Sequence, residues 1–264
     1  MRTPIKGQEK EQNQNMNEMR LINKYLNLLE ASLVGTLYKD PPADPWAGPT
    51  YNPALRTLGR DWPALAQTMI GSTRMGNLRN ACETAILDGI PGDFIETGVW
   101  RGGACIFMKG IIEAYGERER RVFVADSFMG LPKPDAEKYT ADKGDTHHTH
   151  KQLAVSRKDV EDNFKSYQLL DERVVFLEGW FKDTLHRAPI EKLAVLRVDG
   201  DMYESTIQAM DALYSKLSPG GFLIVDDYFL APCAQAINEF RAKHGINEVI
   251  LPIDGMGVYW RRNR

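Results

Sequence analysis

The sequence has little of what marks disulfide-stabilised or zinc-binding proteins. Its 264 residues include only three cysteines, Cys82, Cys105 and Cys233. They lie far apart in apolar segments and form no CxxC pair, which argues against a disulfide framework and against a zinc site. We therefore expect reduced, buried thiols and a cytoplasmic protein.

Long apolar runs and an excess of basic charge are also missing. No apolar segment approaches the roughly 20 residues that a membrane-spanning helix needs. The N-terminal segment lacks the apolar core of a signal peptide. A net charge of −3 gives no support for a nucleic-acid partner or an anionic membrane surface. These absences predict a soluble globular protein with neither kind of partner.

The first third of the chain has a helical pattern. Residues 1–20 are rich in Gln, Asn, Glu and Lys, so we predict a disordered tail there. Apolar residues recur at helical spacing in 21–38 and again in 62–90, on either side of the proline-rich stretch 40–49. The helical face predicted for the first of these segments comprises Leu21, Tyr25, Leu28, Leu29, Leu33 and Leu37. Residues 21–90 are predicted to form a helical preface or lid that packs on the core.

From residue 91 to 264, short β-rich runs alternate with helical stretches. Near-continuous Val, Ile, Leu and Phe runs are typical of parallel strands covered on both faces. The runs are DFIETGV (93–99), RVFVADS (121–127), RVVFLEGW (173–180), LAVLRVDG (193–200) and GGFLIVDDY (220–228), followed by NEVILPID (247–254) and GVYWRR (257–262). The turn-prone Asp254-Gly255 between the last two predicts an antiparallel hairpin. We predict an α/β, doubly wound, mostly parallel seven-stranded sheet, whose ligands bind outside the carboxyl ends of the strands.

Polar residues follow the predicted strands. They are Glu96 and Gly98, Asp126 and Ser127, Glu178 and Gly179, Asp199 and Asp201, and Asp226 and Asp227. Each alone is an ordinary loop residue or helix cap, but capping does not require so many carboxylates at one edge. A hard cation relieves their repulsion, and Asp199, Asp226 and Asp227 could supply three oxygen ligands to Mg²⁺. Asp201 is then either a general base or the N-cap of the helix that begins near Tyr203.

The segment ETGVWRGGA (96–104) follows the first predicted strand and opens a helix. Its glycines permit a tight turn, and the helix N-terminal amides favour an anionic group. The spacing G-x-x-x-G-G differs from the G-x-G-x-x-G of dinucleotide-binding folds, so no pyrophosphate cradle is expected. Asp126, one strand later, suits a ribose diol. Together these features favour S-adenosylmethionine.

Several long stretches strongly resemble the macrocin O-methyltransferase family, which comprises metal- and S-adenosylmethionine-dependent sugar O-methyltransferases of antibiotic biosynthesis. They are ETGVWRGGACIFMKGI, VADSFMGLPKP, FLEGWFKDTL, LAVLRVDGDMYEST, LSPGGFLIVDDY and GVYWRR. The resemblance implies a class I methyltransferase core, a small-molecule glycoside substrate and a homo-oligomer. It implies Mg²⁺ on Asp199, Asp226 and Asp227, and Asp201 as the base. The implied S-adenosylmethionine contacts are Thr68, Met69, Glu96, Thr97, Gly98, Trp100, Asp126, Ser127, Gly179, Trp180 and Phe181.

The predicted activity is therefore Mg²⁺-dependent methylation of a deoxysugar hydroxyl on a glycosylated natural product. A catechol or another phenol is the alternative acceptor, because the same metal chemistry serves vicinal oxygens. A nicotinamide-dependent oxidoreductase or sugar epimerase would require the missing glycine motif. A scaffold with a vestigial site is disfavoured by the intact carboxylate set.

Two further groups of residues allow more than one interpretation. His147, His148 and His150 lie in a long polar insertion, residues 133–154, and are either metal ligands or a second base, or part of a solvated lid. We favour the lid, with one histidine near the substrate. The aromatic residues Trp46, Tyr51 and Trp62 either stack on a sugar ring or simply pack over the core, and packing is the expected role.

Overall fold

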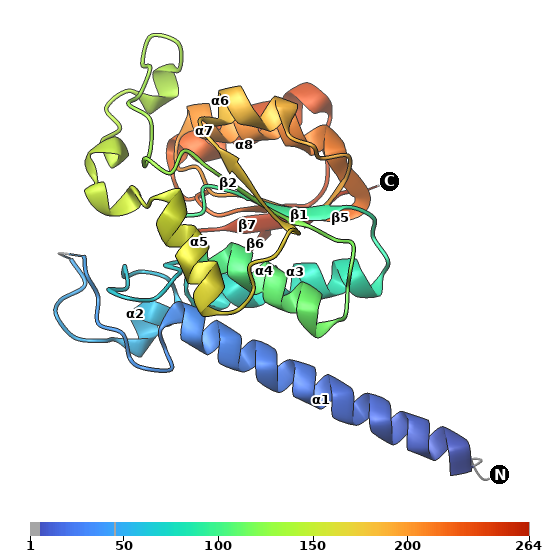
Figure 1. The fold of residues 1–264 in the computed structure, drawn as a ribbon. Coiled ribbons are helices and arrows are strands. Elements are labelled where there is room, and N and C mark those ends of the chain that lie inside the picture. The colour runs from blue at the N-terminus through green and yellow to red at the C-terminus, as the bar shows by residue number, and fades with distance from the viewer. Residues whose placement is uncertain (1–5, 45, 264) are drawn as a thin grey trace.

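The computed structural model describes residues 6–44 and 46–263, and a seven-stranded sheet forms its centre (Figure 1). The strands are β1 (Asp93–Thr97), β2 (Val122–Asp126), β3 (Val174–Glu178), β4 (Leu193–Val198), β5 (Leu217–Val225), β6 (Leu251–Pro252) and β7 (Val258–Arg261). They lie in the order β3-β2-β1-β4-β5-β7-β6. Strands β1 to β5 run parallel, and β7 runs antiparallel to β5 and β6. The predicted doubly wound, mostly parallel sheet with a terminal hairpin is confirmed.

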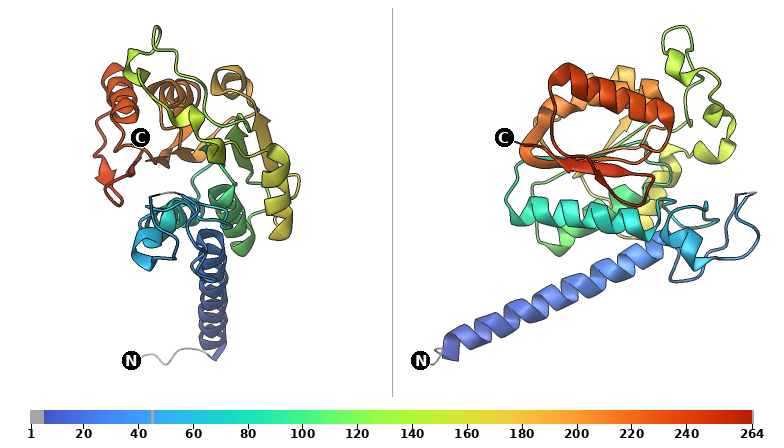
Figure 2. Two further views of the ribbon diagram at one scale, coloured as in Figure 1. Left: turned by 90° about the vertical axis from the view of Figure 1, so that its left-hand side faces the viewer. Right: turned by 180° about the vertical axis from the view of Figure 1, so that it is seen from behind.

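Helices cover both faces of this sheet (Figures 1 and 2). On one face lie α1 (Lys6–Val34), α3 (Gly71–Leu87), α4 (Gly103–Ala114) and α5 (Arg157–Ser166), and on the other α6 (Phe181–Thr184), α7 (Tyr203–Leu213) and α8 (Ala231–His244). Alternate strand residues serve the two faces: Phe94 and Val195 pack with the first group, and Ile95 and Leu196 with the second. Burial on both faces explains why the strands are near-continuous apolar runs in the sequence.

The N-terminal segment differs from its prediction. Helix α1 begins at Lys6, so a disordered tail over residues 1–20 is wrong for residues 6–20, and residues 1–5 lie outside the described part of the chain. Gln, Glu and Lys are good helix formers. Adding residues to a helix that is already formed carries no new nucleation cost. The packed second half of α1 therefore extends into a polar first half.

The buried face of α1 also differs from the predicted one. Leu29 and Leu33 are buried as expected, but they share that face with Leu26 and Val34, whereas Leu21, Leu28 and Leu37 are largely exposed. Two apolar stripes run along this helix, and contact with α4 decides between them. The contact is close: a Cβ on Gly110 of α4 would lie 2.3 Å from Leu29 Cδ2.

The predicted helical stretch 62–90 is an α-helix only from Gly71 onward. The segment before it is held by buried polar groups. Asp40 Oδ2 accepts hydrogen bonds from the backbone amides of Leu65 (2.8 Å) and Ala66 (2.7 Å). Arg56 of the short helix α2 (Pro53–Thr57) is fully buried and binds Asp61 at 2.7 Å. The Asp40 carboxylate thus accepts the hydrogen bonds that backbone carbonyls would accept if residues 65 and 66 were helical.

Across the described ranges 6–44 and 46–263, the helices fall short of the combined length and apolarity that a bilayer crossing requires.

Candidate active site

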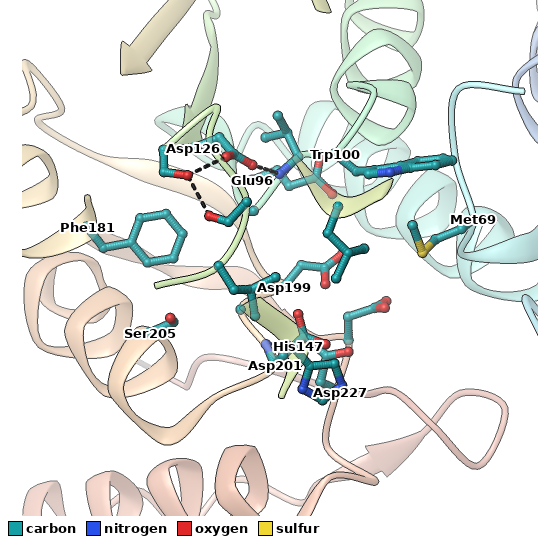
Figure 3. A pocket seen from close by; sticks show the side chains of 18 of the residues that line it. Met69, Glu96, Trp100, Asp126, His147, Phe181, Asp199, Asp201, Ser205 and Asp227 are labelled. Atoms are coloured by element: carbon teal, nitrogen blue, oxygen red, sulfur yellow. Dashed lines mark hydrogen bonds between the residues drawn. The ribbon is translucent and has the colours of Figure 1, made fainter. Parts of the chain in front are cut away.

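A cavity of about 620 Å³ opens at the carboxyl ends of the parallel strands (Figure 3). Its lining includes most of the predicted site residues: Thr68, Met69, Glu96, Gly98, Trp100, Asp126, Ser127, Trp180, Phe181, Asp199, Asp201, Asp226 and Asp227. Thr97 and Gly179 do not line it. The Thr97 side chain is buried and lies 3.5 Å from the Arg197 carbonyl oxygen, and the Gly179 amide donates to the Asp126 carbonyl oxygen at 2.9 Å.

None of the described side chains of α1 lines the cavity. The predicted helical preface contributes instead through the segment between α2 and α3 and through the first turn of α3, with Gly59, Trp62, Met69, Ile70 and Arg74. Only this second part of the preface therefore borders the site, and α1 packs against α4.

The turn after β1 requires glycine at position 98. Gly98 has φ +87°, and a Cβ there would lie 1.7 Å from the Asp199 carbonyl oxygen. No side chain fits at that distance. The β1 and β4 ends therefore approach each other closely enough to form one continuous wall. Trp100 (φ 48°) and Asp201 (φ 56°) also have left-handed backbone conformations, which cost energy in residues other than glycine and cluster at functional sites.

Asp126 fastens the β1 turn to the end of β2. Its carboxylate accepts hydrogen bonds from the amides of Val99 (2.8 Å) and Phe128 (2.7 Å). Burial raises the pKa of Asp126, and these amides oppose the rise. The carboxylate still borders the cavity, and its contact with a ribose stays a prediction.

Arg197 is the central cation of the site, and sequence reasoning missed it. Arg197 lies in β4, and its guanidinium pairs with the carboxylates of Glu96, Asp199 (2.6 Å) and Asp226. The side chain is almost fully buried. A signal was present, because a charged residue inside the apolar run LAVLRV needs a buried partner.

Arg74 of α3 supplies a second cation that had no local sequence signal. It pairs with the other oxygen of Asp226, and it also lies 3.1 Å from Asp254 in the β6–β7 turn. Both oxygens of Asp226 are therefore bound by arginine. Among the predicted metal ligands, Asp226 is thus bound by two arginines, whereas Asp199 is bound by Arg197 through one oxygen.

Carboxyl groups outnumber cations at this end of the site. Five carboxylates border this part of the cavity, those of Glu96, Asp199, Asp201, Asp226 and Asp227, against two guanidiniums. Burial raises the pKa of Glu96 to about 7, and the Arg197 charge opposes that rise. Burial, followed by the neighbouring Asp201 and Asp199 carboxylates, raises the pKa of Asp227 well above its usual range.

This arrangement fits a divalent cation. Carboxylate oxygens of Asp199, Asp226 and Asp227 lie within 4.8 Å of one another. Oxygen donors are the ligands that Mg²⁺ prefers. A cation there would favour the ionised forms of carboxyl groups whose pKa burial has raised. The predicted ligand set is therefore brought together by the fold.

Asp201 lies beside this cluster but does not cap α7. Asp142, from the insertion after β2, accepts hydrogen bonds from the amides of Tyr203 (2.7 Å) and Glu204 (2.9 Å). The N-cap residue Met202 makes no side-chain cap. The capping alternative for Asp201 is therefore wrong, because a residue far away in sequence occupies that position.

The Asp201 carboxylate instead faces the cavity. Its own amide donates to Asp227 Oδ2 at 3.0 Å, which fixes the backbone. Burial, and then the Asp199 charge, raise the pKa of Asp201 to about 7, while His147 lowers it. A carboxyl group with a pKa near neutral is well matched to accept a proton at physiological pH.

The histidine insertion is structured and attached to the core. It contains three short 3₁₀ turns, residues 140–142, 147–149 and 151–153. Asp142 joins it to α7, and Trp100 Nε1 donates to the Gln152 carbonyl at 2.9 Å. The insertion therefore forms part of the wall of the site.

The three histidines have different surroundings. His147 lines the cavity, and its Nδ1 lies 2.6 Å from Asp145 Oδ2. His148 is exposed, and His150 packs edge-on against Trp62 with ring centroids 5.8 Å apart. Within the described ranges, the group of side chains able to share a cation contains no histidine. The structure thus gives no support to histidine metal ligands, whereas His147 is positioned to contact a ligand.

Figure 3 shows how the site divides into two regions. Asp126 and Trp100 lie in one region, and Asp201, Asp227 and His147 gather in the other. A seven-stranded, doubly wound sheet with a terminal antiparallel hairpin and a site of this kind defines the class I methyltransferases. The calicheamicin methyltransferase CalS11 shares the fold with a TM-score of 0.57 at 18% identity, over 94% of this chain and 92% of that one.

The family follows from closer similarities. The profile of the macrocin-O-methyltransferase (TylF) family matches residues 36–262, and the chain belongs to that family. The O-methyltransferase NovP superposes with a TM-score of 0.89 at 50% identity, over 92% of this chain and 100% of NovP. The family resemblance and the O-methyltransferase activity predicted from the sequence are confirmed.

Two curated relatives have names that include their acceptors. Demethyldecarbamoylnovobiocin O-methyltransferase of Streptomyces niveus is 51% identical over 245 residues, which are 91% of this chain and 94% of the relative. The 8-demethyl-8-(2,3-dimethoxy-alpha-L-rhamnosyl)-tetracenomycin-C 4'-O-methyltransferase of Streptomyces olivaceus is 48% identical over 241 residues, 90% and 92% of the two chains.

Proposed function

We propose that this O-methyltransferase transfers the methyl group of S-adenosylmethionine to a deoxysugar hydroxyl on a glycosylated natural product, with Asp201 as general base and Mg²⁺ as cofactor. The observation that carries the proposal is the half-buried Asp201 carboxylate, which does not cap α7 and lies beside the cluster of Asp199, Asp226 and Asp227. The names of the relatives support the acceptor class, because one of them specifies a rhamnosyl group on tetracenomycin C.

Each region of the cavity has its own part in the proposed reaction. The glycine turn, Asp126 and Trp180 would hold S-adenosylmethionine, with its methyl group directed toward the carboxylates. Asp199, Asp226 and Asp227 would hold Mg²⁺, which when bound lowers the pKa of an acceptor hydroxyl. Asp201 would take the hydroxyl proton while the hydroxyl oxygen attacks the methyl carbon, and the carbon–sulfur bond breaks to release S-adenosylhomocysteine. Methyl transfer needs little other covalent help, so orientation of the two reactants supplies much of the rate.

A phenolic acceptor stays the alternative, since the same carboxylate chemistry would serve it. An acceptor panel distinguishes the two. The purified enzyme is given S-adenosylmethionine, Mg²⁺ and either the rhamnosyl tetracenomycin C acceptor, demethyldecarbamoylnovobiocin or catechol. Mass spectrometry then detects the added methyl group. Methylation of catechol alone would refute the proposed acceptor class. A homo-oligomer and a cytoplasmic location also stay predictions.

The roles of Asp201 and the metal have separate tests. Asp201→Asn should lower kcat by about 10²- to 10⁴-fold, the usual contribution of a general base, while calorimetry shows unchanged S-adenosylmethionine binding. Asp211→Asn, on the exposed side of α7, is the matched control and should retain full activity. EDTA should abolish turnover and excess Mg²⁺ should restore it. Full activity in EDTA would refute the metal assignment, and a modest loss in Asp201→Asn would refute the base.

A further inference from the structure

A second hollow adjoins the active-site cavity. It has a volume of about 440 Å³ and is lined by Trp46, Gly59, Arg60, Trp62, Phe229, Gly255 and Met256. Four of these residues, Gly59, Trp62, Phe229 and Met256, also line the larger cavity. The hollow is therefore an extension of the site, and we call it the outer pocket.

The outer pocket has the opposite chemistry to the inner site. Carboxylates crowd the inner end, whereas aromatic rings and a methionine form most of the outer lining, and Arg60 is the charged residue among them. Trp46 and Phe229 leave 56% and 51% of their surfaces exposed. Large apolar side chains exposed around a hollow are typical of a ligand surface.

The two tryptophans are held in place by one buried carboxylate. Asp44 accepts hydrogen bonds from the Trp46 amide (3.1 Å) through Oδ1 and from the Trp62 amide (2.7 Å) through Oδ2. The rings meet edge to face, with centroids 4.9 Å apart and planes at 78°. The main chain at both tryptophans is therefore held before any ligand binds, and the ring–ring contact restricts the side chains, which lowers the entropic cost of binding.

We propose that the outer pocket binds the aglycone of the acceptor, in the form of a flat, largely apolar ring system. This inference rests on the proposed function. The hydroxyl to be methylated has to reach Asp201, and the rest of the glycoside must then extend away from the carboxylates. The residues shared by the two cavities place the outer pocket on such a path. Binding of the aglycone requires that glycosyl transfer precede methylation.

The nucleotide of an activated sugar is the main rival occupant. A base would also stack on Trp46, but a diphosphate needs several cationic or amide partners. Arg60 is the one basic residue that lines the outer pocket, and it makes no ion pair with any residue in the described ranges. A single guanidinium suits an acidic or carbonyl oxygen on a ring better than two phosphates. The lining therefore favours the aglycone.

The test compares acceptors that all carry an L-rhamnosyl group. The probes are the rhamnosyl tetracenomycin C acceptor, methyl 2,3-di-O-methyl-α-L-rhamnoside and dTDP-L-rhamnose. The wild type should have a kcat/KM for the full glycoside at least about tenfold above that for the methyl glycoside. Trp46→Ala should raise KM for the full glycoside about tenfold, a factor equal to about 1.4 kcal/mol, with little change in kcat. It should thereby erase the preference, and Trp46→Phe should restore most of it.

Leu65→Ala is the matched control, since Leu65 is exposed in the same segment and lines neither cavity. Its kinetics should match those of the wild type. Equal kcat/KM for the full and methyl glycosides would overturn the inference and leave the proposed function standing. A preference for dTDP-L-rhamnose would overturn it in favour of a nucleotide. Equal losses for both glycosides in Trp46→Ala would show a structural role. Methylation of catechol but of no sugar would overturn both proposals.

Discussion

Replacing Arg197 with methionine is the sharpest test of how the charged site is held together. Methionine is similarly long but brings no charge. Asp226 keeps Arg74 as a partner, whereas Asp199 and Glu96 both lose the Arg197 cation, and within the described ranges Glu96 keeps the Cys105 thiol. The glutamate side chain is 3% exposed. Removal of one partner from a buried ion pair typically costs about 3–5 kcal/mol, because a charge is left without compensation.

The same perturbation predicts a pH dependence with a definite sign. Burial raises the pKa of Glu96 from 4.5 to about 7, and Arg197 limits the rise. Because the folded-state pKa lies above the unfolded one, protonated Glu96 favours folding at low pH, and this contribution is lost as the pH rises through about 7. Without Arg197 the folded-state pKa rises further. The stability deficit of Arg197→Met should therefore be small near about pH 5 and large near about pH 8.

Thermal unfolding in EDTA measures this deficit without compensation by a bound cation. At about pH 8 the Tm of Arg197→Met should fall by about 10 °C, given about 2–4 °C per kcal/mol for a chain of this size. The double variant Glu96→Gln with Arg197→Met should recover most of the loss. Arg157→Met is the control, because its ion pairs are exposed and worth less than about 1 kcal/mol. Equal losses in the two arginine variants, or a deficit independent of pH, would refute the reasoning.

Three further substitutions test the shape of the site. Gly98→Ala should abolish S-adenosylmethionine binding in calorimetry, because its Cβ meets the Asp199 carbonyl oxygen, whereas Gly116→Ala has the same sign of φ with open space and should bind normally. Asp142→Ala should cost about 1 kcal/mol in thermal unfolding and also lower kcat, while Ser156→Ala, which uncaps α5, should lower stability alone. His147→Gln should reduce acceptor turnover and His148→Gln should not, since only His147 lines the cavity. The reasoning requires that the two glycine variants differ in S-adenosylmethionine binding and that the two histidine variants differ in turnover. It also requires that kcat fall in Asp142→Ala but not in Ser156→Ala.

The insertion after β2 illustrates how a local pattern can mislead. Its polar composition and histidines predicted a solvated lid, yet its Asp142 caps a helix that starts 61 residues later. A composition argument describes how a segment interacts with water, and it contains no information on distant backbone amides that lack partners. The alternative role of Asp201 as that cap was open for the same reason.

The sequence by itself determined the sheet and the position of the site. Strands buried on both faces must be apolar throughout, so β1 to β5 were visible as local runs. Parallel topology then brings Asp126, Asp199 and Asp226 to one edge, whatever the details of packing. The need for glycine at position 98 could also be inferred from the sequence, because a tight turn between a strand and a helix favours a residue without a side chain.

Only the tertiary structure decided which charges neutralise one another and which helix face is buried. Arg74 binds Asp226 across 152 positions, and no periodicity connects a helix surface with a distant strand end. On α1, two apolar stripes were equally compatible with helical spacing, and contact with α4 at Gly110 selected one. Local sequence governs backbone conformation and burial on average. Ion pairs and helix contacts depend on the distances between elements, and those distances exist only after the chain has folded.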